Sequence, residues 1–443
     1  MTANPSLFSD RRLEAAWLDM QQRLCGMGQK RVQVRALGGD RAGEMRIRRF
    51  LHNPRVTPDE MIEAARTHTA ALVGGRHVLA IQDTTSLRDD GKDSGHYLHP
   101  TIAVDADDGT LLGVVAASFL LRRGKQAAHC NKRAFGDKES ARWLEATQEA
   151  ARLSAAGAAC VTTVADRECD LYEAFALRPP TTELLIRCHH NRVLADATRL
   201  YAAPTALGEL GGSVVHVPAA PGRAERQAKV VLSACPVTLR RPKRNRAAEA
   251  ARLPAKLSLT YVEAREVNAP PRVKPLHWRL LTTHPVQTLP EAQRIIDFYR
   301  RRWSIEQVFR VMKTQGFDIE AVEMQDEAAF ENLVATTLIA AVKVMQMVHD
   351  RDGTAARPLT DAFDPDDQPV LQAVCTTLEG NTAKQKNPHP PGSLAYATWV
   401  CARLGGWTGY YGKPGPIVIH AGLARFNAML MGYHIARHQP GHA

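Results

Sequence analysis

The sequence lacks the cysteine pattern of a disulfide-rich or zinc-binding protein. Its eight cysteines are scattered over 443 residues, and no two are separated by only two residues. Closely spaced cysteine pairs are what structural zinc sites need, and a dense cysteine framework is typical of small secreted domains. We therefore expect free thiols in a reducing compartment, with neither disulfides nor a zinc site.

Long hydrophobic runs and a secretory start are also missing. The longest apolar runs, such as residues 111–121, fall well short of the roughly 20 residues that a membrane-spanning helix needs. The opening MTANPSLFSDRR has neither the basic start nor the apolar stretch of a signal peptide. We expect a cytoplasmic protein with no membrane partner. The chain length of 443 residues predicts two or three domains.

Acidic residues are fewer than basic residues. Lysine and arginine number 57 against 46 aspartates and glutamates, which gives a formal net charge of +11. Such an excess favours a polyanionic partner held by counterion release. Basic residues concentrate at 46–49 (RIRR) and 240–246 (RRPKRNR), although either run could be a solvated cluster without a ligand.

The most informative feature that is present is YRRRWSIEQVFRVMK, residues 299–313. It places Tyr299, Arg302, Glu306 and Lys313 at offsets 0, 3, 7 and 14, which fall within about 60° of one another on a helix that turns ~100° per residue. An ionised acid beside cations suits a catalytic carboxylate that binds a metal, with cations directed toward phosphates. The alternative is a solvated helix with ordinary charge pairs.

Two further acids stand at the ends of predicted strands. HVLAIQDTTSL (77–87) is a β-branched apolar run that stops at Asp83, and CVTTVADRECD (160–170) is a second one that stops at Asp166. Either aspartate could be only a turn former or a helix N-cap. Together with Glu306 they provide the three carboxylates that two divalent cations need for attack on a phosphodiester. Oxygen ligands favour Mg²⁺ or Mn²⁺ over Zn²⁺.

These motifs resemble the three acidic signatures of bacterial insertion-sequence DDE transposases: DTTSL at 83–87, ADRECD at 165–170 and Y-x2-R-x3-E-x6-K at 299–313. The closest branch is the insertion-sequence-four group, which includes the transposase of transposon Tn-five. Residues 49–65 resemble the end of that group's DNA-binding region, and residues 392–407 resemble its C-terminal dimerisation domain. The resemblance therefore covers nearly the whole chain.

The resemblance implies an α/β fold, with an RNase H-like catalytic core that carries Asp83, Asp166 and Glu306. Between the last two acids, β-branched runs separated by turn-rich segments indicate a β-subdomain inserted into the core. Within the core, residues 111–120 read as a central strand. The predicted domains are a helical DNA-binding domain at 1–70, the core at 71–345 with its insertion at about 200–286, and a mainly helical dimerisation domain at 346–443.

The same resemblance suggests roles for residues around the acids. Tyr299, Arg302 and Lys313 would contact phosphates beside the scissile bond. Trp278 precedes Tyr299 by 21 residues and would stack on a base flipped out of the duplex. The alternative for Trp278 is core packing beside Leu280.

Two arginines are weaker candidates for DNA contacts. Arg167 directly follows the second acid, and Arg187 begins a basic run that includes His189, His190 and Arg192. A charged residue beside a metal ligand can simply orient it, and basic loops are often solvated.

The resemblance implies a cut-and-paste transposase. A homodimer would hold two transposon ends in a synaptic complex, with two Mg²⁺ ions, or Mn²⁺, in each active site. Water would nick one strand, the freed 3′-hydroxyl would form a hairpin, and the 3′ ends would join target DNA. The enzyme would be bacterial and cytoplasmic, and associated with the nucleoid when bound to DNA. Two alternatives stay open, namely an RNase H-like nuclease without strand transfer and a catalytically silent DNA-binding regulator derived from a transposase.

Overall fold

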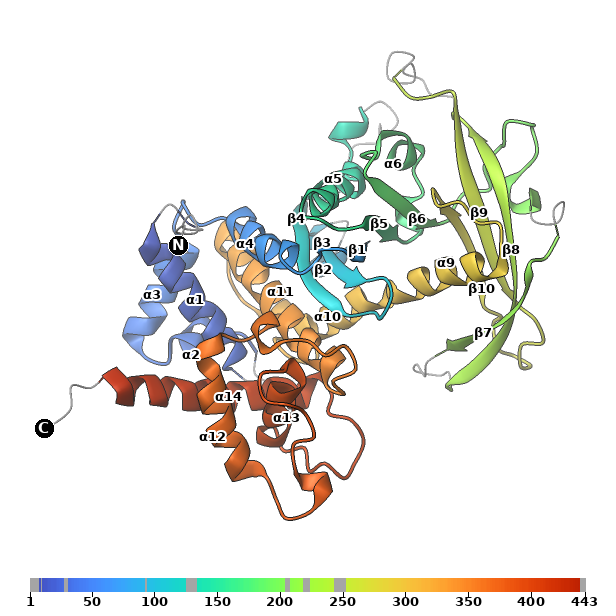
Figure 1. Cartoon of the computed structure of the whole chain (residues 1–443). Coiled ribbons are helices and arrows are strands. Elements are labelled where there is room, and N and C mark those ends of the chain that lie inside the picture. Colours follow the sequence, from blue (N-terminus) through green and yellow to red (C-terminus); the bar gives the residue numbers. More distant parts are fainter. Residues whose placement is uncertain are drawn as a thin grey trace, which may run out of the picture.

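The chain forms a β-rich part and a helical part that are joined by long helices (Figure 1). A computed structural model describes residues 8, 10–27, 31–91, 94–124, 134–203, 208–217, 224–242 and 252–438. Most of the basic run at 240–246 lies outside the described residues, as does Cys130. The seven described cysteines are free, and all except Cys160 are buried.

Within the ranges just given, ten strands form one mixed sheet in the order β2-β3-β1-β5-β6-β10-β9-β8-β7, with β4 paired to β3. The pairs β1–β5 and β5–β6 are parallel, and the other pairs are antiparallel. The strands are β1 His77–Gln82, β2 Thr85–Gly91, β3 Ser94–Asp105, β4 Leu111–Arg122, β5 Cys160–Ala165, β6 Thr182–Arg187, β7 Gly211–Val217, β8 Arg226–Arg240, β9 Lys256–Glu266 and β10 His277–Thr282.

Both faces of the central strands are covered, because successive side chains of a strand point to opposite faces. Along β1, Val78 and Ala80 join the apolar cluster that includes α5 (Ala141–Ala155), whereas Leu79 and Ile81 join the cluster that includes α10 and α11. A strand buried on both faces reads as a continuous apolar run. That is why the run before Asp83 could be recognised as a strand from the sequence.

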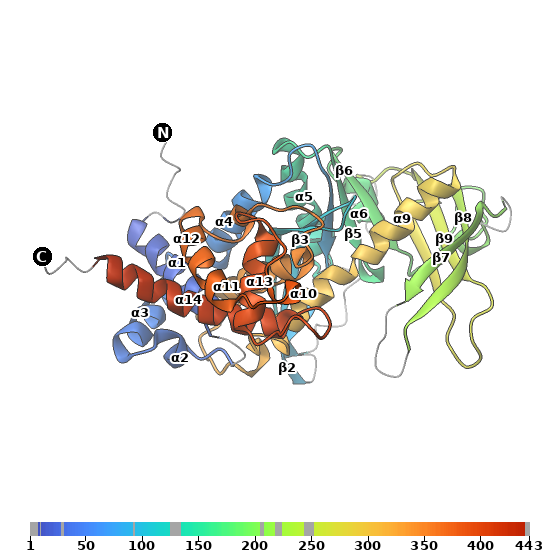
Figure 2. The same cartoon turned by 60° about the horizontal axis from the view of Figure 1, so that its bottom comes forward.

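Helices supply the rest of the fold. Besides α5, they are α1 Arg11–Cys25, α2 Val34–Gly38, α3 Arg41–Leu51, α4 Pro58–Ala70, α6 Tyr172–Leu177, α9 Leu289–Arg301, α10 Trp303–Lys313, α11 Glu327–Asp350, α12 Gln368–Leu378, α13 Leu394–Leu404 and α14 Pro416–His438. Helices α9 and α10 follow one another along nearly one axis (Figures 1 and 2). The segment expected as one helix at 299–313 is therefore divided at Arg302, which belongs to neither helix.

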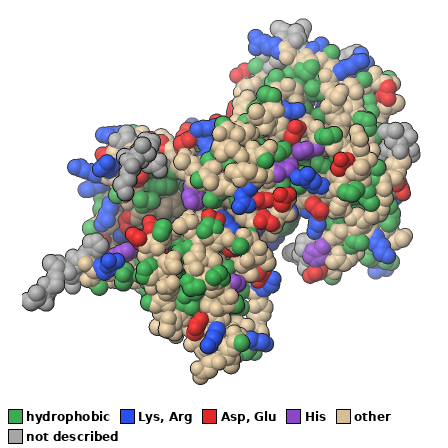
Figure 3. Space-filling model, viewed as in Figure 1, with side chains coloured by type: hydrophobic (Ala, Val, Ile, Leu, Met, Phe, Trp, Pro, Cys, Tyr) green, Lys and Arg blue, Asp and Glu red, His purple; other side chains and the backbone are tan. Residues whose placement is uncertain are grey.

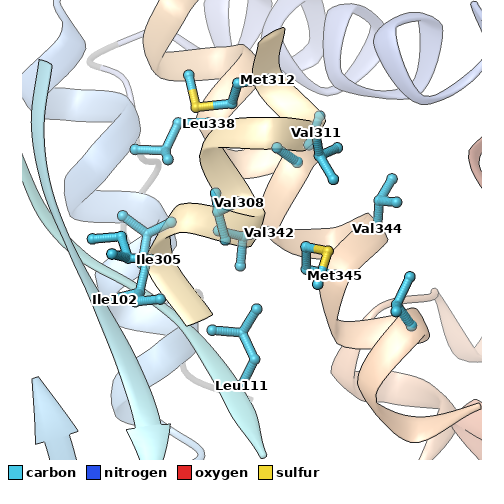
Figure 4. Close-up of a cluster of buried hydrophobic side chains, with 14 of the residues drawn as sticks. Ile102, Leu111, Ile305, Val308, Val311, Met312, Leu338, Val342, Val344 and Met345 are labelled. Carbon is cyan, nitrogen blue, oxygen red and sulfur yellow. The ribbon is translucent and has the colours of Figure 1, made fainter. Parts of the chain in front are cut away.

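The apolar side of α10 fixes its orientation. Figure 4 shows this side packed between the sheet and α11. The side chains involved are Ile305, Val308, Val311 and Met312 of α10, Ile102 and Leu111 of the sheet, and Leu338 and Val342 of α11. Because this face is buried, the side of the helix that carries Glu306 is directed away from the core.

The three strands expected between Asp166 and Glu306 are present as β8, β9 and β10, and β7 precedes them. They continue the central sheet, since Leu281 of β10 pairs with Ile186 of β6. Strand β4 pairs with β3 and is not part of the continuous order of strands given above. The prediction of a central strand at 111–120 was therefore wrong, and its continuous apolar run reflects cover from α4 and α11.

The first helices share a core with the long helix α11. The buried Asn332 side chain of α11 donates hydrogen bonds to the backbone oxygens of Leu51 (2.9 Å) and Val56 (3.0 Å). Helices α1, α3, α13 and α14 also contact α11. The proposed boundaries near residues 70 and 345 thus remain predictions, because one continuous apolar cluster crosses both of them.

Among the described residues, one helix that the sequence analysis did not consider is long and apolar enough to cross a membrane. By length and composition α11 could cross a membrane. However, 78% of its most apolar stretch of 18 residues is buried inside the protein. A mostly buried helix of this kind is what the core of a soluble protein also contains. It therefore gives only weak support for a membrane span.

Candidate functional site

The two predicted aspartates follow adjacent parallel strands at the same edge of the sheet. Ile81 of β1 pairs with Val164 of β5, so Asp83 and Asp166 each lie two residues beyond a paired position. The carboxyl ends of parallel strands meet at one edge, which is where ligand sites of such sheets form. Asp166 also caps the short helix that follows it, since its Oδ1 accepts a hydrogen bond from the Glu168 N–H (2.8 Å).

Arg302 joins the first aspartate to the glutamate of α10. Its Nη1 donates to Asp83 Oδ2 at 2.7 Å, and its Nη2 donates to Glu306 Oε1 at 2.6 Å. The Arg302 side chain is only 15% exposed, so both ion pairs are shielded from water. Two residues that are 223 positions apart in the chain, Asp83 and Glu306, are thereby held by one guanidinium group.

Asp166 and Glu306 both act electrostatically on Asp83. Burial raises the pKa of Asp83 from 3.8 to about 6, and the positive charge of Arg302 opposes this shift. The negative charges of Asp166 and Glu306 raise the same pKa further. Such coupling requires that the three carboxyl groups lie in one region. A carboxyl group with a raised pKa in a charged cluster is also typical of functional sites.

A buried hydrogen-bond chain fixes the loop that follows Asp83. The Thr84 N–H donates to Asp83 Oδ1 (2.8 Å), and the Thr84 hydroxyl lies 2.8 Å from His99 Nδ1. His99 Nε2 lies 3.0 Å from Gln82 Oε1, which accepts a hydrogen bond, so Nδ1 accepts from Thr84 in the neutral ring. Burial lowers the pKa of His99 well below 6.5, which keeps the ring neutral.

Arg142 of α5 connects the loops that follow the two aspartates. Its Nε donates to the Thr84 hydroxyl (3.2 Å), and its Nη2 donates to Glu168 Oε2 (3.1 Å). The Arg142 side chain is 9% exposed. Because Thr84 contacts Asp83 and Glu168 contacts Asp166, Arg142 helps to set the separation of the two acids.

Tyr299 and Trp278 lie beside the acids as a pair. Their ring centroids are 5.6 Å apart at an interplanar angle of 70°, an edge-to-face contact. Burial raises the pKa of Tyr299, and the neighbours that act on it include Arg187, Arg302 and Asp166. Trp278 is half-buried and packs against the main apolar cluster.

Arg187 lies at the site, Lys313 is paired with another acid, and Arg167 is exposed. Arg187 ends β6 and forms a hydrogen bond with Tyr299. Lys313, at the end of α10, forms an ion pair with Glu320 (2.6 Å). Arg167 follows Asp166 and is exposed.

The histidine-rich run after β6 is organised by one buried acid. Asp170 Oδ2 accepts hydrogen bonds from the backbone N–H groups of His189 and His190, both at 2.8 Å. Arg192 forms an ion pair with the same carboxylate (2.6 Å). Asp170 thus shapes this loop and neutralises its arginine, which the sequence pattern did not indicate.

Sequence reasoning missed the supporting residues Gln82, His99 and Arg142. Gln82 adjoins a recognised motif, but nothing marks His99 or Arg142 locally, since their partners lie far away in the chain. The only available indication was the polar character of Gln82, which interrupts an apolar strand just before the acid.

The three carboxylates are candidate metal ligands. Three carboxylates offer only oxygen atoms, which suits Mg²⁺ or Mn²⁺. Within the described ranges, however, no three His, Cys, Asp or Glu side chains form a ready-made ligand cluster, and Arg302 holds one oxygen of each of two acids. The donor chemistry fits a hard divalent ion, but the spacing does not form a closed ligand set.

A mixed sheet with an aspartate after each of two parallel strands, and a glutamate supplied by a helix, is consistent with an RNase H-like DDE domain. Residues 224–343 match the family model described as Transposase DDE domain. The matched segment runs from β8 into α11 and contains Glu306, whereas Asp83 and Asp166 precede it. This match supports a DDE transposase, an enzyme that acts on DNA, and proteins of this family generally use divalent metals.

Proposed function

We propose that this protein is a cut-and-paste DNA transposase of the insertion-sequence-four group. The observation that carries the proposal is the pair of hydrogen bonds from Arg302 to Asp83 (2.7 Å) and Glu306 (2.6 Å). They hold an acid that follows a strand against an acid from a helix, and Asp166 directly follows the neighbouring strand β5. Burial of the cluster strengthens every charge interaction made there, because little water remains to screen it.

Asp83, Asp166 and Glu306 would hold two Mg²⁺ or Mn²⁺ ions. Bound divalent ions supply an activated water or 3′-hydroxyl nucleophile and stabilise the leaving oxygen. The role of the chain is to hold the three carboxylates ionised and oriented. The positive charge of Arg302 favours the ionised form of Asp83 and so opposes the effect of burial on its pKa.

The surrounding cations and aromatic rings are suited to bind the DNA strand. Arg302, Arg187 and the hydroxyl of Tyr299 form one polar group next to the acids, and each can contact a phosphate. Trp278 presents a half-buried ring that could stack on an extruded base during hairpin formation. The exposed Arg167 is a further candidate phosphate contact, and Lys313 would first have to leave Glu320.

Double-stranded DNA would be bound by a homodimer, with two transposon ends and then target DNA. The second half of α14 supports this arrangement, because it leaves Met429, Met431 and Ile435 exposed at 45%, 41% and 60%. Exposed apolar side chains on a projecting helix favour contact with another protein surface. Figure 1 shows α14 extending from the body of the molecule at its C-terminal end.

The test compares nicking of a DNA end by the wild type with nicking by Asp83→Asn, Asp166→Asn and Glu306→Gln. We expect each substitution to abolish Mg²⁺-dependent nicking while end binding persists in a mobility-shift assay. Asp350→Asn is the matched control, because Asp350 is also a buried aspartate, at the end of α11. Normal nicking by any of the first three variants would remove that residue from the site.

Two further assays separate the alternatives. Precleaved ends that yield joined product require a transposase, whereas cleavage without joining indicates an RNase H-like nuclease. End binding without any metal-dependent cleavage by the wild type indicates a catalytically silent regulator.

A further inference from the structure

Two neighbouring arginines at the junction of α9 and α10 reach opposite ends of strand β1. Arg302 donates to Asp83, which directly follows the end of β1. Arg301 reaches the other end, because its Nη1 donates to the backbone oxygen of Asp105 (2.6 Å), and Asp105 pairs with Val78 near the start of β1. Val78 and Asp83 are five positions apart, which corresponds to ~17 Å along a strand. The two side chains therefore hold the helix junction at both ends of this strand.

The turn that receives Arg301, residues 105–110 between β3 and β4, is fixed by its own hydrogen bonds. The Asp105 N–H donates to the backbone oxygen of Thr110 (2.8 Å), and Asp105 Oδ1 accepts from the Asp107 N–H (2.8 Å). The second terminal nitrogen of Arg301, Nη2, donates to the backbone oxygen of Asp107 (2.8 Å). A planar guanidinium held at two carbonyl groups has little freedom to turn. Arg301 is thus a two-point anchor on a rigid turn.

Arg294 attaches α9 to the same end of β1. It precedes Arg301 by seven residues, so both side chains lie on one side of the helix. Its Nη2 donates to Nδ1 of His77, the first residue of β1 (3.1 Å), and lies 4.0 Å from the carboxylate of Asp107. Acidic and basic side chains lie together near the middle of the face in Figure 3, where Figure 1 shows the turn between β3 and β4 beside α9.

The helix is interrupted directly after this anchor. The Arg302 N–H donates to the backbone oxygen of Tyr299 (3.1 Å), and the Ile305 N–H donates to that of Arg302 (3.3 Å). Both bonds span three residues in place of the four of an α-helix, a pattern that often marks a hinge. A residue at such a joint is less constrained than one inside a continuous helix. The contacts of the preceding residue, Arg301, therefore bear directly on where Arg302 lies.

We propose that Arg301 is a positioning residue for the acid site. It holds the end of α9 on the turn at the start of β1, and this places Arg302 where its guanidinium bridges Asp83 and Glu306. The inference rests on the function proposed above, in which these acids carry the chemistry. The hydrogen bonds of Arg301 go to the turn, so it acts on the site through Arg302.

Hydrogen exchange of the protein without metal or DNA tests the junction independently of any reaction. Arg301→Met keeps the apolar stem and removes the donors, so the amides of residues 302–306 should exchange about tenfold faster. Those of α5 should exchange as in the wild type, which shows that the fold is intact. Arg300→Met is the matched control, because Arg300 is the adjacent arginine and pairs with Asp297 of its own helix (2.9 Å). It should leave exchange at residues 302–306 unchanged.

Single-turnover nicking tests the link to Arg302. Arg301→Met should slow nicking by about 100-fold without weakening the binding of a DNA end, because a small displacement of catalytic groups has effects of that size. In an Arg302→Lys background the same substitution should have less than about a threefold effect, because lysine lacks the fork that bridges two acids. A role of Arg301 in stability alone predicts equal factors in both backgrounds. Arg300→Met should nick at the wild-type rate.

Three results would each overturn the proposal. They are wild-type exchange at residues 302–306 in Arg301→Met, wild-type nicking by this variant, and equal factors in the two backgrounds. If Arg301→Met does not fold, Arg301→Lys, which keeps one donor nitrogen, is measured in the same way. If the wild type does not nick DNA, the proposed function fails, and the exchange experiment still decides whether Arg301 sets the junction.

Discussion

The raised pKa of Asp83 makes the stability of the protein depend on pH in a way that one substitution can reveal. Burial raises this pKa from 3.8 to about 6. Between these values the folded state binds more protons than the unfolded state, so this group's contribution to stability falls as the pH rises. A shift of about two units at ~1.36 kcal/mol per unit corresponds to about 3 kcal/mol. The loss is complete above the folded-state pKa.

Asp83→Asn removes this titration. The variant should therefore gain stability relative to the wild type by about 3 kcal/mol between pH 4 and pH 7. The assay is urea unfolding of both proteins at a series of pH values in the presence of a chelator. The quantity of interest is the difference between their free energies of unfolding, because titrations common to both proteins cancel in it.

Asp350→Asn is a useful comparison, since burial raises the pKa of Asp350 to about 6 as well. It should give a difference curve of the same sign but leave nicking intact, which separates the effect of burial from a role in catalysis. A difference curve for Asp83→Asn that is flat, or that falls as the pH rises, would refute the argument that desolvation dominates at this carboxyl group.

Five further substitutions test packing and the site. A Cβ atom at Gly422 would lie 1.5 Å from a backbone oxygen of α13, so Gly422→Ala should cost about 3 kcal/mol in urea unfolding. Gly432→Ala in the same helix, with nothing within 4 Å, should be neutral or stabilising by up to about 1 kcal/mol. His99→Leu removes the partner of the buried Gln82 Oε1 and the acceptor of the Thr84 hydroxyl proton, and should cost about 2 to 4 kcal/mol in the same assay. Arg142→Met should slow single-turnover nicking by about 100-fold, because a small displacement of catalytic groups has effects of that size. The circular dichroism spectrum should stay unchanged. Nicking at the wild-type rate would exclude the positioning role of Arg142. Trp278→Ala should preserve nicking and reduce hairpin formation, whereas equal loss of both steps would indicate that the ring only packs against the tyrosine of α9.

The strands and helices around the acids could be read from the sequence because their causes are local. Apolar runs predicted β1 and β5, and both end directly before an acid, at Asp83 and Asp166. Helical spacing predicted that Arg302 and Glu306 share one side of a helix, and their ion pair across four residues agrees with this. The division of that helix at Arg302 was not foreseen, since the residue keeps helical backbone angles and only the hydrogen-bond pattern changes.

Sheet order could not be read in the same way. Pairing of β10 with β6 makes β7–β10 continuous with the central sheet, and such pairing depends on which strand edges remain free once the core has packed. The run that forms β4 was predicted to be a central strand because an apolar run does not show how many neighbouring strands it pairs with. A run indicates burial on both faces, which helices can provide for a strand that pairs on one side.

The sequence by itself determined the kind of chemistry that this protein can support: three acids, each beside cations or hydroxyl residues, at strand ends and on a helix. Only the tertiary structure decided that Arg302 reaches Asp83 across 219 positions and that Arg142 joins the two loops. The physical reason is that propensity and periodicity act over a few residues, whereas charge pairing and desolvation depend on distances in space that only the packed core fixes.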